Sequence, residues 1–220
     1  MLNLLIADDH PMFRLALRQA VLGVHDDAMV LEAGTLDEAL TVLRETPAVD
    51  LVLLDLHMPG SHGLMGLSLL RSEFPAVAVM MISANDDPLI IRRSLDHGAA
   101  GFLPKRAGIE ELKGALDCVL DCREYVPAEL RTAVHAADPQ SEDRVLADRL
   151  ASLTPQQLRV LTRVAQGRLN KQIADELGIT ERTVKAHVSA LFEKLKVRNR
   201  TQAGVLLRSL TLADPAQQQS

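Results

Sequence analysis

The sequence of 220 residues has few aromatic side chains: one tyrosine, four phenylalanines and no tryptophan. Pockets for small organic ligands are lined mainly by apolar and aromatic side chains, so this scarcity argues against a domain that senses a small molecule. Only two cysteines are present, Cys118 and Cys122. Two thiolates cannot complete the four-ligand shell of a structural zinc site. We expect buried, reduced thiols, as is usual in the cytoplasm.

Long apolar runs are also missing. No run approaches the roughly 18 residues that a membrane-spanning helix needs, and residues 1–9 lack the basic region that opens a secretion signal. Hydrophobic residues still make up 47% of the chain, which is ordinary for a globular protein. We therefore expect a folded cytoplasmic protein without membrane contact.

Charge is distributed unevenly along the chain. Residues 1–125 carry 10 Lys or Arg against 19 Asp or Glu, a net charge of −9, and residues 151–220 carry 11 against 5, a net charge of +6. Between them, residues 138–143 have the polar, proline-containing composition of a linker. We predict a front domain over residues 1–125, a linker over 126–150 and a rear domain over 151–220. A basic domain suggests a polyanionic partner, although two solvated faces would give the same charges.

The front domain alternates short apolar strands with amphipathic helices. The predicted strands lie at residues 2–7, 29–33, 51–54, 77–82 and 100–103, and each is followed by apolar residues at helical spacing. Such alternation requires parallel strands joined by right-handed crossovers. We predict an α/β fold with a doubly wound five-stranded parallel sheet and helices on both faces.

Asp55 directly follows the apolar run at residues 51–54, and Pro59-Gly60 then breaks the chain. Ligands of open parallel sheets bind beyond the carboxyl ends of the strands. A carboxylate at that place is either a structural cap on the next turn or a reactive group. Asp55 alone does not decide between the two.

Polar residues at the ends of three other strands favour a reactive site. Asp8 and Asp9 follow the first strand, Ser83 the fourth and Lys105 the fifth, so we expect these side chains to meet at one edge of the sheet. Clustered carboxylates suit Mg²⁺, which prefers oxygen ligands. A carboxylate can accept a phosphoryl group, and a lysine and a hydroxyl can hold the phosphoryl oxygens.

Residues 1–123 resemble the receiver domain of bacterial response regulators, a flavodoxin-like fold. The resemblance rests on four motifs: Asp8-Asp9, Asp55 with Met58-Pro59-Gly60, Ser83-Ala84, and Gly101-Phe102-Leu103-Pro104-Lys105.

The resemblance assigns a role to each motif. It implies that Asp55 is the phosphorylation site and that Asp9 and Asp55 ligate Mg²⁺. It also implies that the backbone carbonyl of His57 is a metal ligand and that Asp8 acts through a bound water. Ser83 and Lys105 would hold the phosphoryl group, and Phe102 matches the switch aromatic, although it equally suits a core position.

Four histidines of the front domain lie in loops or at a helix end: His10, His57, His62 and His97. No pair of them shows the spacing of metal ligands, so we predict no histidine metal site. His57 lies two residues after Asp55, where side chains of the receiver family influence the rate of dephosphorylation.

In the rear domain we predict four helices, at residues 155–166, 171–177, 181–195 and 201–210, with Asn170 as the cap of the second. A helix, a short turn at Gly178 and a second helix form a helix-turn-helix arrangement. The polar side of the third helix carries Arg182, Lys185, His187 and Ser189. A solvated face explains these residues as well as a nucleic-acid contact does.

The order of residues 177–188 favours DNA, because it resembles the DNA-binding domain of the NarL/FixJ (LuxR-type) regulators, as do residues 153–155, 170–174 and 194–201. The resemblance implies that Lys185, Ala186 and Ser189 face the bases of the major groove. Candidates for phosphate contacts are Asn170, Lys171, Thr180, Arg182, Thr183, His187, Arg198 and Arg200.

Together the two resemblances identify the chain as a two-component response regulator. They imply that a sensor histidine kinase phosphorylates Asp55, and that phosphorylation controls sequence-specific binding of a homodimer to double-stranded promoter DNA and hence transcription. RNA polymerase is a further candidate partner. The chain would be no enzyme beyond its own phosphoryl transfer and dephosphorylation. We also expect the acidic front domain to lie against the basic recognition face until phosphorylation changes the surface near Phe102.

Two other functions fit parts of the sequence. A Mg²⁺-dependent phosphatase of the haloacid-dehalogenase type also uses an aspartate at a strand end, but it needs a second aspartate where this chain has His57. A LuxR-type regulator that senses a small molecule would need an aromatic pocket, which the composition disfavours.

Overall fold

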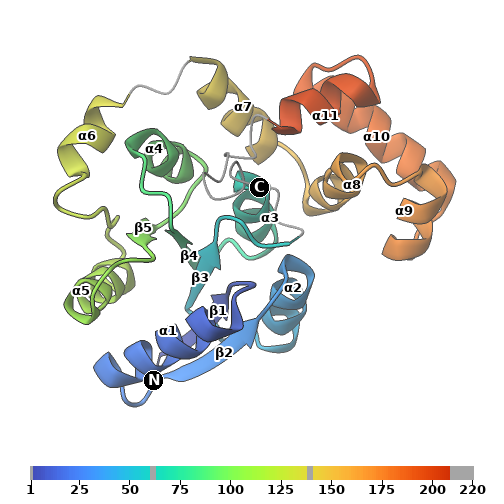
Figure 1. Ribbon diagram of the computed structural model, residues 1–220. Coiled ribbons are helices and arrows are strands. Elements are labelled where there is room, and N and C mark those ends of the chain that lie inside the picture. Colours follow the sequence, from blue (N-terminus) through green and yellow to red (C-terminus); the bar gives the residue numbers. More distant parts are fainter. Residues whose placement is uncertain (1, 60–62, 138–140, 209–220) are drawn as a thin grey trace.

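The computed structural model describes residues 2–59, 63–137 and 141–208. Over these residues the front domain holds a five-stranded parallel sheet in the order β2-β1-β3-β4-β5 (Figure 1). The strands are β1 (Asn3–Ala7), β2 (Met29–Ala33), β3 (Leu51–Asp55), β4 (Ala78–Ser83) and β5 (Gly101–Pro104). The predicted doubly wound sheet is confirmed. From β1 the chain first adds β2 on one side and then β3, β4 and β5 on the other. The switch point lies between β1 and β3, and open sheets of this order bind their ligands there.

Helices cover both faces of the sheet because successive side chains of a strand point to opposite sides. In β3, Leu51 and Leu53 face one helix layer, and Val52 and Leu54 face the other, so the whole strand is apolar. The first layer comprises α1 (Pro11–Val24) and α5 (Ile109–Leu120), and the second comprises α2 (Leu36–Glu45), α3 (Leu64–Glu73) and α4 (Pro88–Asp96).

Six further helices follow in the described part of the chain. They are α6 (Arg131–Ala136), α7 (Ser141–Ala151), α8 (Pro155–Ala165), α9 (Asn170–Leu177), α10 (Glu181–Leu195) and α11 (Arg200–Arg208). Helices α8 to α11 form the predicted helix-turn-helix unit, and Gly178 makes its turn with a φ of 64°. The prediction that Asn170 caps a helix is wrong: Asn170 is the first helical residue, and the preceding N–H of Leu169 donates to Gln172 Oε1.

The chain after α5 covers the edge of β5. Tyr125 forms an isolated parallel bridge with Gly101, in which the Phe102 N–H donates to the Tyr125 carbonyl at 3.0 Å. A Cβ on Gly101 would lie 2.9 Å from the Tyr125 carbonyl oxygen, so the close approach of the two backbones requires glycine. Helix α6 then packs against α4 and buries Val134. The chain's own linker thus covers part of the α4–β5 surface.

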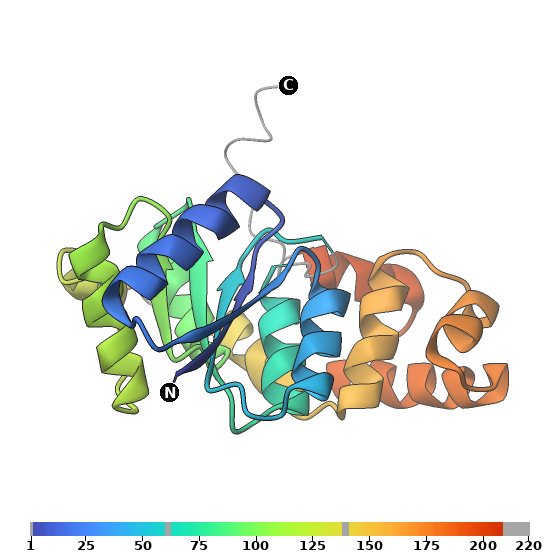
Figure 2. The same ribbon diagram turned by 90° about the horizontal axis from the view of Figure 1, so that it is seen from below.

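The linker helix α7 and the first helix of the rear domain, α8, contact the front domain. Figure 2 shows α8 beside α2 and α3. Arg159 donates from Nε and Nη2 to the Glu73 carboxylate, at 2.5 Å each, and Arg163 Nη2 lies 3.1 Å from Asp37 Oδ1. The expected attraction between the two domains is present. The prediction that the acidic domain covers the recognition face is wrong, because its carboxylates meet the arginines of α8.

Two further expectations concern the environment of the chain. Among the described helices, none combines the length and the apolar character that crossing a bilayer requires. The prediction of buried thiols is wrong, since Cys118 is half-buried and Cys122 is exposed. The reason is local: α5 ends at Leu120, and Cys122 lies in the turn beyond it with a φ of 58°.

Candidate functional site

The carboxyl ends of β1, β3, β4 and β5 bring the predicted site residues together. Asp8, Asp55 and Ser83 are buried there. Lys105 reaches back from the end of β5 and places its Nζ 2.6 Å from Asp8 Oδ2 and 3.3 Å from Asp55 Oδ1. Adjacent parallel strands of similar length make this meeting unavoidable, because their ends lie at one edge of the sheet.

Asp55 is held in an environment that does not favour its charge. Burial raises the pKa of the Asp55 carboxyl above its usual value, the Lys105 ammonium opposes this effect, and the charge of Asp8 adds to it. The backbone N–H of His57 donates a hydrogen bond to the same carboxyl. Asp55 Oδ2 is buried and has no hydrogen-bond partner within residues 2–59, 63–137 and 141–208. A buried oxygen in that state is costly unless an ion or a substrate satisfies it.

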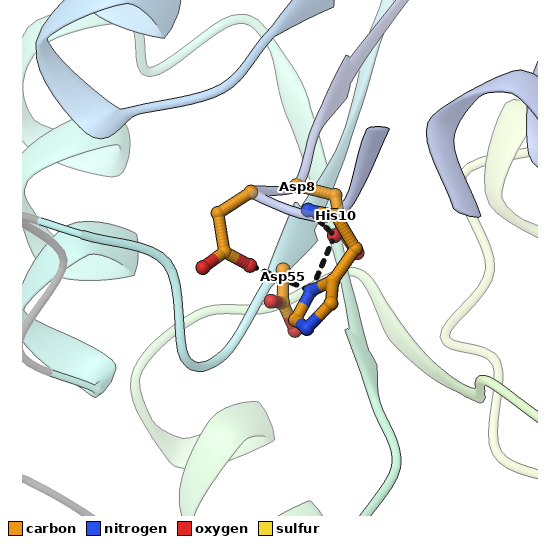
Figure 3. A group of neighbouring side chains, drawn as sticks. Asp8, His10 and Asp55 are labelled. Atoms are coloured by element: carbon orange, nitrogen blue, oxygen red, sulfur yellow. Dashed lines mark hydrogen bonds and ion pairs between the residues drawn. The ribbon is translucent and has the colours of Figure 1, made fainter. Parts of the chain in front are cut away.

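The side chains around Asp55 fit a divalent cation. Asp8, Asp9, His10 and Asp55 each offer one ligand atom, and these atoms lie within 4.8 Å of one another. Figure 3 shows the Asp8 and Asp55 carboxylates and the His10 ring gathered in one group. The carboxylates match the oxygen preference of Mg²⁺, and the unpartnered oxygen of Asp55 supports the same assignment.

His10 is a candidate site residue that the sequence did not indicate. Its Nδ1 lies 2.7 Å from Asp9 Oδ1 and 3.1 Å from Asp8 Oδ1. His10 thus belongs to the group of possible ligands, although the spacing between the histidines alone predicted no histidine metal site. Of the other histidines, His97 contacts Ser68 on α3, and His62 lies outside the described residues.

The remaining front-domain residues occupy their expected places. Ser83 Oγ accepts a hydrogen bond from the Asn85 N–H at 3.0 Å, and the Ser83 carbonyl accepts one from the Lys105 N–H at 2.8 Å. Phe102 is fully buried in the core beneath α4, the core position that the sequence also allowed. The Lys105 Nζ also lies 4.7 Å from the centre of the Phe13 ring, a cation–π contact that no motif indicated.

The recognition helix α10 presents its polar side to solvent. Thr180 caps the helix by accepting the Thr183 N–H, and Lys185 Nζ lies 3.2 Å from Glu181 Oε1, a weak surface ion pair. The exposed candidates for DNA contact are Lys171, Thr180, Arg182, Lys185, Ala186, Ser189 and Arg198, and the half-buried ones are Asn170, Thr183 and His187.

Arg200 has a different place from the one predicted. Its guanidinium donates to the carbonyl oxygens of Arg168 and Val164, at the C-terminal end of α8. Basic side chains stabilise helix ends in this way. In this geometry Arg200 joins α11 to the end of α8.

Comparison with known proteins places both domains. Residues 4–117 match the response regulator receiver domain family, and residues 151–207 match the bacterial regulatory proteins of the luxR family.

Two curated relatives span nearly the whole chain. The glycerol metabolism activator of Pseudomonas putida is 42% identical over 206 residues, covering 92% of this chain and 93% of that protein. The nitrate/nitrite response regulator protein NarL of Escherichia coli K12 is 35% identical over 203 residues, with the shares again 92% and 93%.

Solved structures share the fold. RcsB from Salmonella enterica serovar Typhimurium, bound to promoter P1flhDC in the presence of phosphomimetic BeF3−, has a TM-score of 0.57 at 22% identity, covering 96% of this chain and 99% of that chain. A LuxR family DNA-binding response regulator from Silicibacter pomeroyi has a TM-score of 0.52 at 32% identity, covering 59% of this chain and 99% of that chain. With a receiver domain at its front and a LuxR-type DNA-binding domain at its rear, this chain belongs to the NarL/FixJ family of two-component response regulators.

Proposed function

We propose that Asp55 is the phosphoryl acceptor of this response regulator and that a sensor histidine kinase or a small phosphodonor supplies the group. The observation that carries the proposal is the buried Asp55 carboxylate, which has one oxygen beside Lys105 and the other without a hydrogen-bond partner in the part of the chain that the structure describes. The unpartnered Oδ2 is the nucleophile. It attacks phosphorus, the bond to the donor atom breaks, and an acyl phosphate remains on Asp55.

Lys105 and Ser83 stabilise the phosphorylated state. The Lys105 ammonium sits between two carboxylates and can exchange its contact with Asp8 for a phosphoryl oxygen. Ser83 lies at the end of the neighbouring strand, where its hydroxyl can donate to a second phosphoryl oxygen. Phe102 follows on β5 as the switch aromatic. The domain carries out its own phosphoryl transfer and dephosphorylation, and we propose no other enzymatic activity.

Asp9, Asp55 and the backbone carbonyl of His57 would hold Mg²⁺ directly, and Asp8 would act through a bound water. When bound, Mg²⁺ neutralises the carboxylates and lowers the cost of gathering phosphoryl charge there. Asp8 is assigned the indirect role because both of its carboxylate oxygens already have partners. Asp8 Oδ1 already accepts the His10 N–H, and Asp8 Oδ2 pairs with Lys105.

Removing Asp9 should therefore weaken Mg²⁺ binding more than removing Asp8. We expect a loss of roughly tenfold for Asp8→Ala, the scale of an outer-shell partner, and a larger loss for Asp9→Ala. Calorimetric titration with Mg²⁺ measures both, and Asp26→Ala, an exposed acid at the start of the loop before β2, is the control. Equal or reversed losses would contradict the assignment.

We propose that the rear domain, residues 151–220, binds double-stranded promoter DNA as a homodimer, with Lys185, Ala186 and Ser189 facing the bases. Lys171, Thr180, Arg182, Thr183, His187, Arg198 and Asn170 would contact phosphates, which position the protein without reading sequence. Residues 126–150 connect this domain to the receiver, residues 1–125. The protein would act in the cytoplasm, with RNA polymerase as a further partner.

Lys185→Ala should lower operator affinity by about 1–3 kcal/mol and relax the preference at one base position. Arg198→Ala should instead weaken binding to all sequences alike and lower the salt slope by about one unit. Binding to a randomised operator pool at several salt concentrations separates the two effects. If the Lys185 variant keeps its full sequence preference, Lys185 does not read a base.

One experiment tests the whole proposal. The full chain is incubated with a small phosphodonor and Mg²⁺, its mass and oligomeric state are measured, and bound DNA is selected from a random pool. We expect one added phosphoryl group, a shift toward dimer, and tighter binding of a sequence with paired half-sites. An unmodified chain, or a modified chain with unchanged DNA binding, would contradict the proposal.

A further inference from the structure

The loop between β1 and α1 brings an imidazole into the carboxylate cluster. His10 occupies the N-cap position of α1, yet its side chain makes no capping hydrogen bond. The backbone N–H of His10 donates to Asp8 Oδ1 at 2.8 Å, which fixes the loop. The ring then turns toward the acids, and its Nδ1 approaches Asp9 Oδ1 to 2.7 Å and Asp8 Oδ1 to 3.1 Å.

Figure 3 shows this ring beside the Asp55 carboxylate. The His10 side chain is 66% exposed, so the ring can shift without disturbing the core, whereas Asp8 and Asp55 are fixed by burial. The exposed member of the group therefore supplies the nitrogen, and the buried members Asp8 and Asp55 supply oxygens.

A second observation indicates that the group is incomplete without an ion. Among the described residues, the buried Asp55 Oδ2 has no hydrogen-bond partner, and Asp55 contributes one of the ligand atoms that lie within 4.8 Å of one another. Ligands around a first-row metal lie about 2.0–2.2 Å from it, so the ligand atoms of one shell are separated by roughly twice that distance or less. The four side chains are thus near coordinating positions already.

The chemistry of the set differs from that of an all-oxygen site. Mg²⁺ takes carboxylates, carbonyls and water and gains little from an imidazole. Mixed nitrogen and carboxylate sites suit transition metals, whose affinities rise from Mn²⁺ through Co²⁺ to Ni²⁺. Lys105 holds Asp8 Oδ2, which leaves Asp9, His10 and Asp55 as the principal ligands.

We infer that His10 is a metal ligand that makes this site bind first-row transition-metal dications in preference to Mg²⁺. The inference deepens the proposed function, because it rests on the same cluster that would hold Mg²⁺ for phosphorylation. The receiver would then have two kinds of occupant: Mg²⁺ on oxygen ligands alone, and a transition metal that also recruits the ring of His10.

The test compares Ni²⁺ and Mg²⁺ affinities, by calorimetry at one pH with untagged full-length protein. His10→Ala should weaken Ni²⁺ binding roughly 10–100-fold, since even the outer-shell partners of metal ligands are worth that much, and should leave Mg²⁺ binding nearly unchanged. His10→Gln, which keeps a polar side chain but removes the imidazole nitrogen, should behave in the same way. His25→Ala, at the far end of α1, should behave like wild type.

A spectroscopic measurement gives an independent readout. Co²⁺ added to wild type should show visible absorption bands that shift when His10 is replaced, because imidazole and water differ as ligands. The inference fails if His10→Ala leaves the Ni²⁺ affinity and the Co²⁺ spectrum unchanged, or if it weakens Ni²⁺ and Mg²⁺ equally. The Mg²⁺ titration of wild type reports separately on the proposed function, since that function needs Mg²⁺ binding but not His10.

Discussion

Asp55→Asn should abolish phosphoryl incorporation from a small phosphodonor, while wild type takes up one phosphoryl group. The amide has nearly the shape of the carboxylate but is neutral and cannot act as the nucleophile that forms the acyl phosphate. Asp55 is the member of the cluster that lies at the end of the central strand β3, beside Lys105 and next to the strand that carries Ser83. The expected difference is therefore all or none, as measured by intact mass.

A matched control lies at the other end of the same strand. Asp50 precedes β3, is exposed, and accepts a hydrogen bond from the Asn3 N–H at 2.8 Å. Asp50→Asn should be labelled like wild type. Undiminished labelling of Asp55→Asn would move the acceptor to another carboxylate, and loss of labelling in Asp50→Asn would mean that the assay reports folding and not chemistry.

Glu73→Gln should loosen the contact between the two domains. The Glu73 side chain is 5% exposed and accepts hydrogen bonds from Arg159 and from Arg44. The variant keeps the shape but leaves two arginines without their counter-charge, which costs about 1–3 kcal/mol. The lower part of that range is expected, because both arginines are partly solvated. Urea unfolding and the radius of gyration in solution measure the effect, and the exposed Glu45→Gln on α2 is the control.

The same contact should respond to acid. Burial alone would raise the pKa of the Glu73 carboxyl, but the hydrogen bonds from Arg159 and Arg44 prevail and hold it below its usual value. A carboxyl with a lowered pKa stabilises the docked form above its unfolded pKa, about 4.3, and this stabilisation is lost as the pH falls through the lowered value. Docking that is unchanged by acidification, or that weakens with acid equally in Glu73→Gln, would contradict the role given to Glu73, whereas Glu45→Gln should respond to acid like wild type.

Opening this contact should barely change the affinity for a single DNA half-site. The recognition helix α10 is already exposed in the docked arrangement, so the receiver does not shield Lys185. The net charges of the two domains correctly predicted attraction but did not say which faces meet. A net charge has no direction, and the choice of α8 depends on where Glu73 and Asp37 stand on their helices.

Much of the candidate phosphorylation site could be predicted because it depends on the hydrophobic pattern of the strands and on their parallel topology. Buried parallel strands are apolar throughout, so their ends are visible in the sequence, and parallel strands must bring Asp8, Asp55, Ser83 and Lys105 to one edge. His10 was missed because its role depends on the turn of a loop after β1. No hydrophobic pattern reports such a turn.

The contacts of Arg200, in contrast, could not be predicted from the sequence. The sequence motif around it predicts a basic surface, but a guanidinium can satisfy helix-end carbonyls as well as phosphates, and the choice depends on the distance between α11 and α8. The bridge between Gly101 and Tyr125 was equally invisible. It pairs residues on either side of α5, and the only sign in the sequence is a glycine that begins a strand.

That bridge decides where the receiver can be cut. A fragment that stops at Arg123 would lack Tyr125, the partner of Gly101 on β5. The edge of β5 would then be open, and an open strand edge is a template for pairing with other chains. The fragment would also uncover the apolar side of α4 that Val134 now seals. We expect such a fragment to self-associate, whereas one that runs through α6 to Ala137 should stay dispersed. The receiver therefore folds as a unit that extends through α6, into residues that the sequence predicts to be linker.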